Sequence, residues 1–175
     1  MEIYNLGQTA ISTESLTTEN SEVIQIEKYH FQFNKWKQPH SYDTYGGKLI
    51  LDHNSEPLFA ELVVLRLFEQ LGFKGVWVDT YRNKFWQRLP AISFPVIIDS
   101  KLQGIYDHIY KTKGGKRSGC FDVMVYKDDQ FVFAELKRKQ KDSIRNTQVE
   151  WLQAGLSLGI DKSNFIICEW EITVD

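Results

Sequence analysis

The sequence has little cysteine, no cationic leader and no long apolar run. Only two of its 175 residues are cysteines, Cys120 and Cys168, and neither belongs to a Cys-x-x-Cys pair or a Cys/His metal-binding spacing. Two isolated cysteines are typical of a reducing compartment. No apolar stretch approaches the roughly 20 residues that span a bilayer, and residues 1–22 lack the basic and apolar regions of a secretory signal. We therefore expect a cytoplasmic or nucleoid-associated chain that is not secreted and has no membrane partner.

Several familiar catalytic motifs are also missing. The chain contains no HExxH, GxSxG or GxGxxG. Gly114 and Gly119 have the glycine spacing of a P-loop, but Cys120 and Phe121 stand where the phosphate-binding Lys and the Mg²⁺-binding Ser or Thr should follow. Four histidines without metal-ligand spacing are expected to be structural or exposed: His30, His40, His53 and His108.

Composition and charge are those of one globular domain with a basic sector. The chain is 42% hydrophobic and 14% aromatic, enough for a sizeable single core. Its net charge is −2, but residues 111–145 contain ten Lys or Arg against five Asp or Glu, and residues 1–27 contain five Glu and no Lys or Arg. A basic sector on an acidic body is typical of a local polyanion site, although an ordinary solvated surface gives the same pattern.

Alternating helical and strand patterns predict an α/β fold in one compact domain. Residues 1–50 are read as an N-terminal extension with one or two strands at 22–36 and a turn at Gly46-Gly47, and residues 51–175 as the core. Residues 1–20 are polar and are expected to be loose. The later elements expected are a strand at 75–79, a helix from about 96 to 111, a β-hairpin at 120–139 turning at 127–130, a helix from a cap at Asp142 or Ser143 to about Leu158 before Gly159, and a strand at 164–174.

The clearest helix is expected between residues 54 and 72. Asn54 or Ser55 can cap it, Pro57 fits its first turn and Gly72 fits the position after its end. At 100° per residue, Glu61 lies on an apolar side of this helix, where a lone carboxylate is costly. Glu61 is therefore a candidate functional residue.

The β-hairpin brings charged residues to one end of the sheet. Alternate strand residues share a face, so Glu135 and Lys137 lie on the same face about 6.6 Å apart. A turn at 127–130 places Asp122 at the same open end. Two adjacent carboxylates repel each other unless a cation lies between them, and oxygen ligands suit Mg²⁺ or Mn²⁺. The alternative is a strand-end ion pair of Glu135 with Lys137, and a turn acid at Asp122.

If Mg²⁺ or Mn²⁺ binds at this end of the sheet, each of these residues has a role. Asp122, Glu135 and the Leu136 carbonyl would hold the ion, which lowers the pKa of a bound water and polarises a phosphoryl oxygen. Lys137 would orient that water or stabilise the charge that develops on phosphorus.

Two further residues are expected to join from the flanking helices. Glu61 would complete the network of metal-bound waters or bind a second metal; its structural alternative is an ion pair with Arg66 or another cation. Gln148, one helical turn before Trp151, would reach the site with its amide while Trp151 anchors the helix in the core. Its structural alternative is a surface polar residue.

This ordered set resembles the PD-(D/E)xK nuclease superfamily, and most closely the VRR-NUC domain family. The resemblance covers residues 54–170 and consists of a helix with an inward Glu, an Asp, a Glu-x-Lys about a dozen residues later on a hairpin, and a following helix. The matching residues are Arg117-Ser118-Gly119, Asp122, Glu135, Lys137, Gln148, Trp151, Leu152 and Gly159. Phe121 replaces the usual Pro, and there is no Val-Arg-Arg stretch.

The resemblance implies a restriction-endonuclease-like core, with a mixed β-sheet flanked by helices. It implies a metal-dependent DNA endonuclease or exonuclease of DNA repair or recombination, with branched or flapped DNA as substrate, as in structure-specific nucleases or Holliday-junction resolvases. A homodimer is a further expectation. Seven residues are expected to contact the DNA backbone: Lys113, Lys116, Arg117, Arg138, Lys139, Lys141 and Arg145.

Two other functional classes stay open from the sequence. The first is a catalytically inactive nucleic-acid-binding module of the same fold. The second is an interaction or inhibitor protein whose acidic N-terminal region carries the function.

Overall fold

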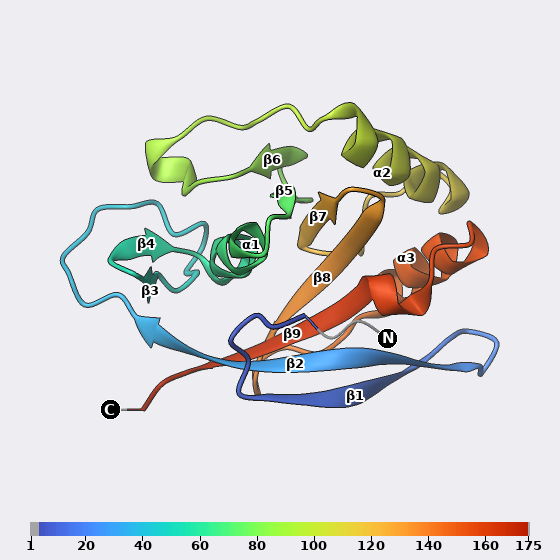
Figure 1. Cartoon of the computed structure of the whole chain (residues 1–175), viewed down its shortest axis with the longest axis horizontal. Coiled ribbons are helices and arrows are strands. Elements are labelled where there is room, and N and C mark those ends of the chain that lie inside the picture. The colour runs from blue at the N-terminus through green and yellow to red at the C-terminus, as the bar shows by residue number, and fades with distance from the viewer. Residues whose placement is uncertain (1–3, 175) are drawn as a thin grey trace.

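The computed structural model describes residues 4–174, and within them it contains a nine-stranded mixed sheet and three α-helices (Figure 1). The elements are β1 (Ala10–Thr17), β2 (Val23–Lys35), β3 (Leu51–His53), β4 (Glu56–Leu58), α1 (Ala60–Gln70), β5 (Lys74–Asp79), β6 (Lys84–Trp86), a 3₁₀ turn at Pro90–Ile92, α2 (Ser100–Thr112), β7 (Val123–Lys127), β8 (Gln130–Arg138), α3 (Asn146–Ser157), a 3₁₀ turn at Lys162–Asn164 and β9 (Phe165–Ile172).

The strands run in the order β4-β3-β2-β9-β8-β7-β5-β6, and β1 also pairs with β2. β9 is parallel to both β2 and β8, whereas the other pairs are antiparallel. The expected α/β class with a mixed sheet is therefore confirmed. Within the described residues, no helix is both long and apolar enough to cross a membrane.

Both faces of the sheet are buried. The side chains of β8 alternate between the two cores that lie on these faces. Ala134 packs on the face that α1 covers with Leu62 and Phe68. Phe133 packs on the opposite face with Trp151 of α3, beside α2. Figure 1 shows α2 and α3 next to each other, with α3 between α2 and the right-hand end of β1 and β2, where Leu16 and Ile26 belong to the same core cluster as Trp151.

The N-terminal segment is part of the sheet. β1 pairs with β2 from Ala10 opposite His30 to Thr17 opposite Val23, and β2 continues the sheet as the parallel neighbour of β9 (Figure 1). The side chains of Tyr4, Leu6 and Leu16 are buried. The expectation of a loose segment is therefore wrong for residues 4–20, while residues 1–3 lie outside the described part.

The first helix begins later than the capping pattern predicts. Asn54 and Ser55 both have positive φ, 53° and 67°, and form the two-residue turn of the β3–β4 hairpin. Pro57 pairs with Asp52 in that hairpin instead of occupying a helical first turn. Asn and Ser favour turns as well as helix caps, and here the turn prevails because both central residues of this hairpin type need positive φ. Gly72, with φ of +85°, follows the helix end as expected.

The other two helices also start later than expected. α2 is capped by Asp99, whose carboxylate accepts hydrogen bonds from the backbone N–H groups of Lys101 and Leu102. Asp142 does not cap α3: its carboxylate accepts from the backbone N–H of Arg138, 3.0 Å away, and so closes the turn after β8. The 120–139 hairpin and the final strand are where the sequence places them.

Candidate functional site

Asp122 lies at the open end of the β7–β8 hairpin and bridges two strands. Its carbonyl accepts a 2.7 Å hydrogen bond from Val78 of β5, and its Oδ2 accepts a 2.9 Å bond from the backbone N–H of Leu136 on β8. The N–H and C=O of one strand residue point to the same side. The Leu136 carbonyl therefore faces the same edge as its N–H, beyond Val123, where the pairing of β7 with β8 ends.

Glu135 is the most enclosed carboxylate of the cluster, with 2% of its surface exposed. Its Oε1 accepts hydrogen bonds from Lys137 Nζ, at 2.7 Å, and from Nε2 of Gln148 on α3. Its Oε2 is buried and has no hydrogen-bond partner within the described residues. A buried carboxylate oxygen without a partner is costly and marks a place where a ligand would be stabilised.

Both carboxylates of the hairpin have raised pKa values. Burial and then the charge of Asp122 hold the pKa of Glu135 well above its ordinary value. Burial and then the charge of Glu61 raise the pKa of Asp122 to about 6, although the Leu136 N–H, Lys48 and Lys137 act in the opposite direction. Like charges brought together out of water give this signature, and it clusters at functional sites.

Glu61 reaches the site from the first turn of α1 and is 6% exposed. Its carboxylate is bonded to Lys48 Nζ. The cation expected as its structural partner is therefore Lys48 and not Arg66, because Arg66 pairs with Glu56 and Glu69.

Gln148 joins the site because α3 is fixed on both sides of it. Trp151, one turn later, is fully buried. Gly119 has φ of +80°, and a Cβ there would lie 1.9 Å from the Thr147 carbonyl oxygen. The segment before Asp122 thus packs directly on the start of α3, which explains why a glycine is needed at this point of the sequence.

Sequence reasoning missed two charged residues at this end of the sheet. Lys48 follows the Gly46-Gly47 turn in the loop between β2 and β3, so no helical or strand period signals its position. Asp79 ends β5 next to Val78, which is bonded to Asp122, and is 6% exposed. The sequence pattern that could have identified Asp79 is the one that identifies Glu135, namely an acidic residue at the end of an apolar strand.

The residues fit one hard divalent cation better than a larger metal centre. Among residues 4–174, no group of three or more His, Cys, Asp and Glu side chains is arranged to hold a metal ion by itself. Mg²⁺, however, is commonly held through one or two carboxylates together with waters and substrate phosphate. Asp122, the open Oε2 of Glu135 and the Leu136 carbonyl are donors of this kind.

A cleft of about 370 Å³ opens beside Glu61 and Leu136. Three cationic side chains line it, namely Lys48, Arg138 and Lys141. Two acids, Glu61 and Asp142, line it as well. The three cations allow the cleft to admit an anionic chain beside Glu61 and Leu136.

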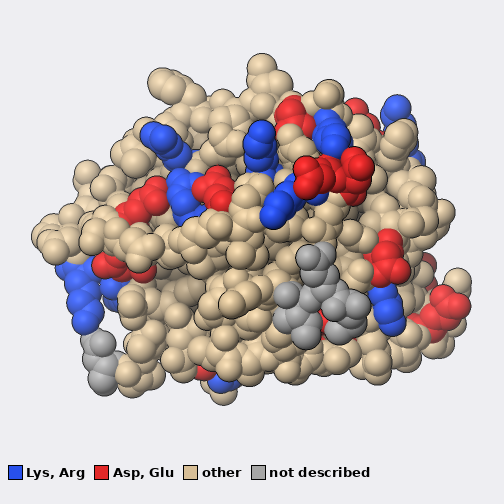
Figure 2. Space-filling model, in the orientation of Figure 1, with Lys and Arg blue, Asp and Glu red and all other residues tan. Residues whose placement is uncertain are grey.

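The seven predicted DNA-contacting residues differ in accessibility. Lys116, Arg117, Lys139, Lys141 and Arg145 are exposed and Arg138 is half-buried. The Lys113 side chain is only 4% exposed, and its Nζ is bonded to the Ser118 carbonyl and to Glu150. Lys113 therefore fastens the 113–119 loop to α3 and does not face solvent. On the face shown in Figure 2, basic and acidic side chains are interspersed and form no patch of one sign.

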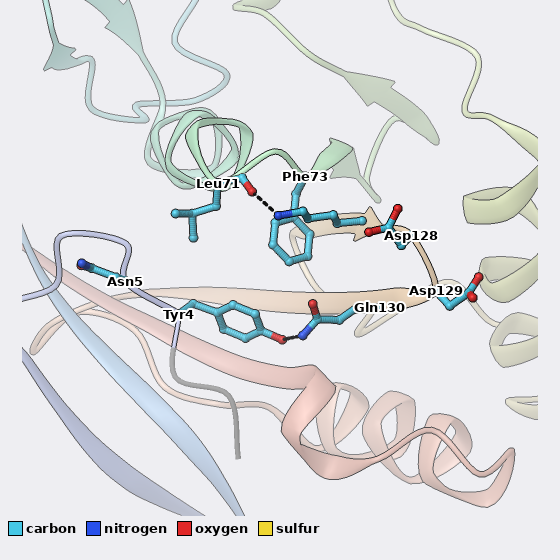
Figure 3. Close-up of a pocket in the computed structure, with 8 residues that line it drawn as sticks. Tyr4, Asn5, Leu71, Phe73, Asp128, Asp129 and Gln130 are labelled. Carbon is cyan, nitrogen blue, oxygen red and sulfur yellow. Dashed lines mark hydrogen bonds between the residues drawn. The ribbon is translucent and has the colours of Figure 1, made fainter.

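A second hollow lies at the opposite, turn end of the hairpin (Figure 3). Lys127 Nζ donates to the Leu71 carbonyl at 2.9 Å, and Gln130 Nε2 donates to the Tyr4 hydroxyl at 2.8 Å. Both groups thus donate to other protein atoms. Among the described residues that line this hollow, no side chain has a buried oxygen without a hydrogen-bond partner like Oε2 of Glu135.

Comparison with protein-family models, with curated proteins and with solved structures finds no match. The fold and the site define the chain as a mixed-sheet α/β protein with a cluster of carboxylates and two lysines at one sheet end, of which Glu61, Asp79, Glu135 and Lys137 are buried.

Proposed function

We propose that this chain is a metal-dependent nuclease that hydrolyses DNA phosphodiester bonds with Mg²⁺ or Mn²⁺. The observation that carries the proposal is the Glu135 carboxylate, buried beside Asp122 with one oxygen bonded by Lys137 and Gln148 and the other left open. Two neighbouring carboxylates with raised pKa values are costly without a cation, and a divalent ion removes that cost.

The order of the elements supports the same reading. Asp122 directly precedes the first strand of the hairpin, β7, and Glu135 and Lys137 lie on its second strand, β8. A helix with the inward Glu61 comes before the hairpin in the chain, and a helix with Gln148 follows it. This is the order that the resemblance to PD-(D/E)xK domains implies. We therefore propose a restriction-endonuclease-like core as the finer description of the fold.

The proposed chemistry assigns a role to each side chain. A divalent ion held by Asp122, Glu135 and the Leu136 carbonyl would supply Lewis acidity and lower the pKa of an attacking water. Lys137, fixed at 2.7 Å from Glu135 Oε1, places its ammonium to orient that water or to bond a nonbridging phosphoryl oxygen. Gln148 keeps the Glu135 carboxylate in one orientation through its amide. The oxygen of the attacking water would bond to phosphorus and release a proton to solvent, while the bridging P–O bond breaks and the leaving alkoxide oxygen takes up a proton from a solvent water.

DNA would enter through the cleft that Lys48, Arg138 and Lys141 line. Contacts of this type go to the phosphate backbone, so binding should be salt-dependent and largely independent of sequence. Branched or flapped DNA is the proposed substrate class. A homodimer is proposed from the exposed apolar side chains of Ile92, Phe94 and Ile97, which a second copy would cover.

Cleavage of a panel of linear, nicked, flapped and four-way DNAs tests the function. We expect cleavage with Mn²⁺ or Mg²⁺, none in EDTA and none by Asp122→Asn, which keeps an acceptor for the Leu136 N–H. Asp129→Asn is the matched control, because Asp129 is a fully exposed acid at the other end of the same hairpin. Cleavage that persists in EDTA or in Asp122→Asn would overturn the proposal.

A second candidate is a nucleic-acid-binding module of the same fold without turnover. The observation that favours it is the Glu61 carboxylate, which is bonded to Lys48 and not left open for a metal. This candidate predicts salt-dependent DNA binding that survives both EDTA and Asp122→Asn, with no cleavage of any member of the panel.

A further inference from the structure

Asp122 has an acidic neighbour on each side, and the two sides differ. Toward α3 lies Glu135, whose Oε2 is buried and unpartnered. Toward α1 lies Glu61, whose charge raises the pKa of Asp122 and whose own carboxylate is bonded to Lys48. One side therefore offers an open oxygen to a cation, and the other already has an ammonium group.

Lys48 is held in place by more than its bond to Glu61. Its Nζ lies 5.5 Å from the centre of the Trp77 ring and 5.8 Å from that of Phe59, within the range of cation–π attraction. Both rings belong to the core around α1. The ammonium thus lies between a carboxylate and two aromatic rings, while 37% of the Lys48 side chain is exposed at the cleft.

The charges around Lys48 keep it protonated. Burial alone would lower its pKa, but the charges of Glu61, Asp122 and Asp79 outweigh burial and raise the pKa above its ordinary value. Asp79 has an oxygen, Oδ2, that is buried without a hydrogen-bond partner within the described residues, with Arg82 Nη1 3.6 Å away. Three carboxylates therefore act on one ammonium.

We propose that the Lys48 ammonium occupies the position of a second divalent cation on the α1 side of Asp122. The site then takes one divalent ion, on the Glu135 side, and Lys48 supplies the other positive charge. This inference rests on the proposed metal-dependent function. It also gives Glu61 a role that differs from metal binding: Glu61 positions a lysine.

Counting bound Mn²⁺ tests the inference without measuring activity. The full chain, free of DNA, is titrated with Mn²⁺ by calorimetry and by the loss of the free-ion electron paramagnetic resonance signal. We expect one ion in the wild type and two in Lys48→Met, because the Glu61, Asp122 and Asp79 oxygens then lack a counter-charge. The double variant Lys48→Met/Glu61→Gln should return to one ion.

Lys141→Met is the matched control, since Lys141 lines the same cleft and removing it deletes an equal charge without touching Glu61. We expect it to keep one ion, and Lys48→Arg should also keep one ion because the cation stays. One ion in both the wild type and Lys48→Met, or two in the wild type, would overturn this inference and leave the proposed function standing. No ion in either protein would overturn both.

A folding defect in Lys48→Met still gives a decisive result. Removing the ammonium leaves a buried, uncompensated Glu61, so some loss of stability is expected. If Mn²⁺ takes the vacated place, it should raise the melting temperature of Lys48→Met more than that of Lys48→Met/Glu61→Gln. Equal Mn²⁺ shifts in the two variants would contradict the proposal.

Discussion

The Lys137 ammonium donates a 2.7 Å hydrogen bond to Oε1 of Glu135, two residues earlier on the same strand. Both side chains are almost fully enclosed, with 9% and 2% exposed. Residues two apart on a strand share one face, and these two lie at the sheet end that Asp122 also reaches. The Glu135–Lys137 pair thus has a structural role, as an ion pair, and a proposed catalytic role. Substitution of Lys137 can separate the two.

Replacing Lys137 by Met should abolish most of the activity with little loss of structure. Met has a similar length without the charge, and Glu135 can take up a proton because its pKa is already raised. We expect Mn²⁺-dependent cleavage to fall by about 10²–10³-fold, the usual effect of removing a group that stabilises transition-state charge. Lys127→Met, at the turn end of the hairpin, is the control. Activity of Lys137→Met within a few-fold of wild type would contradict the assigned role.

Gln148 should be needed both for the start of α3 and for the site. Its Oε1 accepts from the Arg145 N–H at 2.8 Å, and its Nε2 donates to Glu135. Gln148→Leu should lower the free energy of unfolding by about 1–2 kcal/mol and cleavage by about 10–100-fold. Gln153→Leu, on the same helix, should change stability by less than about 0.5 kcal/mol. Denaturant unfolding and single-turnover cleavage measure the two effects, and full activity of Gln148→Leu would refute the positioning role.

The parts of the site that lie on regular elements could be predicted from sequence. Strand alternation placed Glu135 and Lys137 on one face, and the spacing from Trp151 turned Gln148 inward. Lys48 could not be predicted, because it comes from a loop whose path no periodicity describes. Asn54 and Ser55 are expected to cap a helix but form a hairpin turn, since their side chains suit both positions equally well. β1 was missed because, as an edge strand, it buries little more than Leu16.

Gly119→Ala should be among the most destabilising single substitutions in the chain. The residue has φ of +80°, and its new Cβ would meet the Thr147 carbonyl oxygen at 1.9 Å, so the loop and α3 would have to separate. We expect a loss of about 3 kcal/mol or more. The control is Gly104→Ala, in α2, where a Cβ meets nothing within 4 Å and where Ala should add about 0.5–1 kcal/mol. Urea unfolding of both variants decides, and a loss below about 1 kcal/mol for Gly119→Ala would contradict this packing.

The N-terminal strand should contribute to global stability. Leu16 is 4% exposed, whereas Ile11 on the same strand is 38% exposed. Leu16→Ala should cost about 2–4 kcal/mol, and Ile11→Ala less than about 1 kcal/mol. Removing residues 1–20 should lower the melting temperature sharply, because it also uncovers one edge of β2. An unchanged melting temperature of the truncated chain would show that β1 adds nothing to the fold.

Without divalent cations, the contribution of Asp122 should make the protein less stable as the pH rises. The pKa of Asp122 increases from its ordinary 3.8 to about 6 on folding, so the native state binds its proton more tightly than the unfolded state. Stability from this group is complete below about pH 4 and is lost as the pH rises toward 6, by up to about 2–3 kcal/mol. Mn²⁺ should offset the loss, because it favours the charged form.

Melting temperatures measured in EDTA from pH 4 to 7 test this directly. Asp122→Asn should show a flatter pH dependence than the wild type, both because its own titration is gone and because the charge that raises the pKa of Glu135 is removed. Asp129→Asn should follow the wild type, since Asp129 is fully exposed. Parallel curves for the wild type and Asp122→Asn would mean that Asp122 is ionised as easily in the fold as in the unfolded chain. The cost that a bound cation is proposed to remove would then not exist.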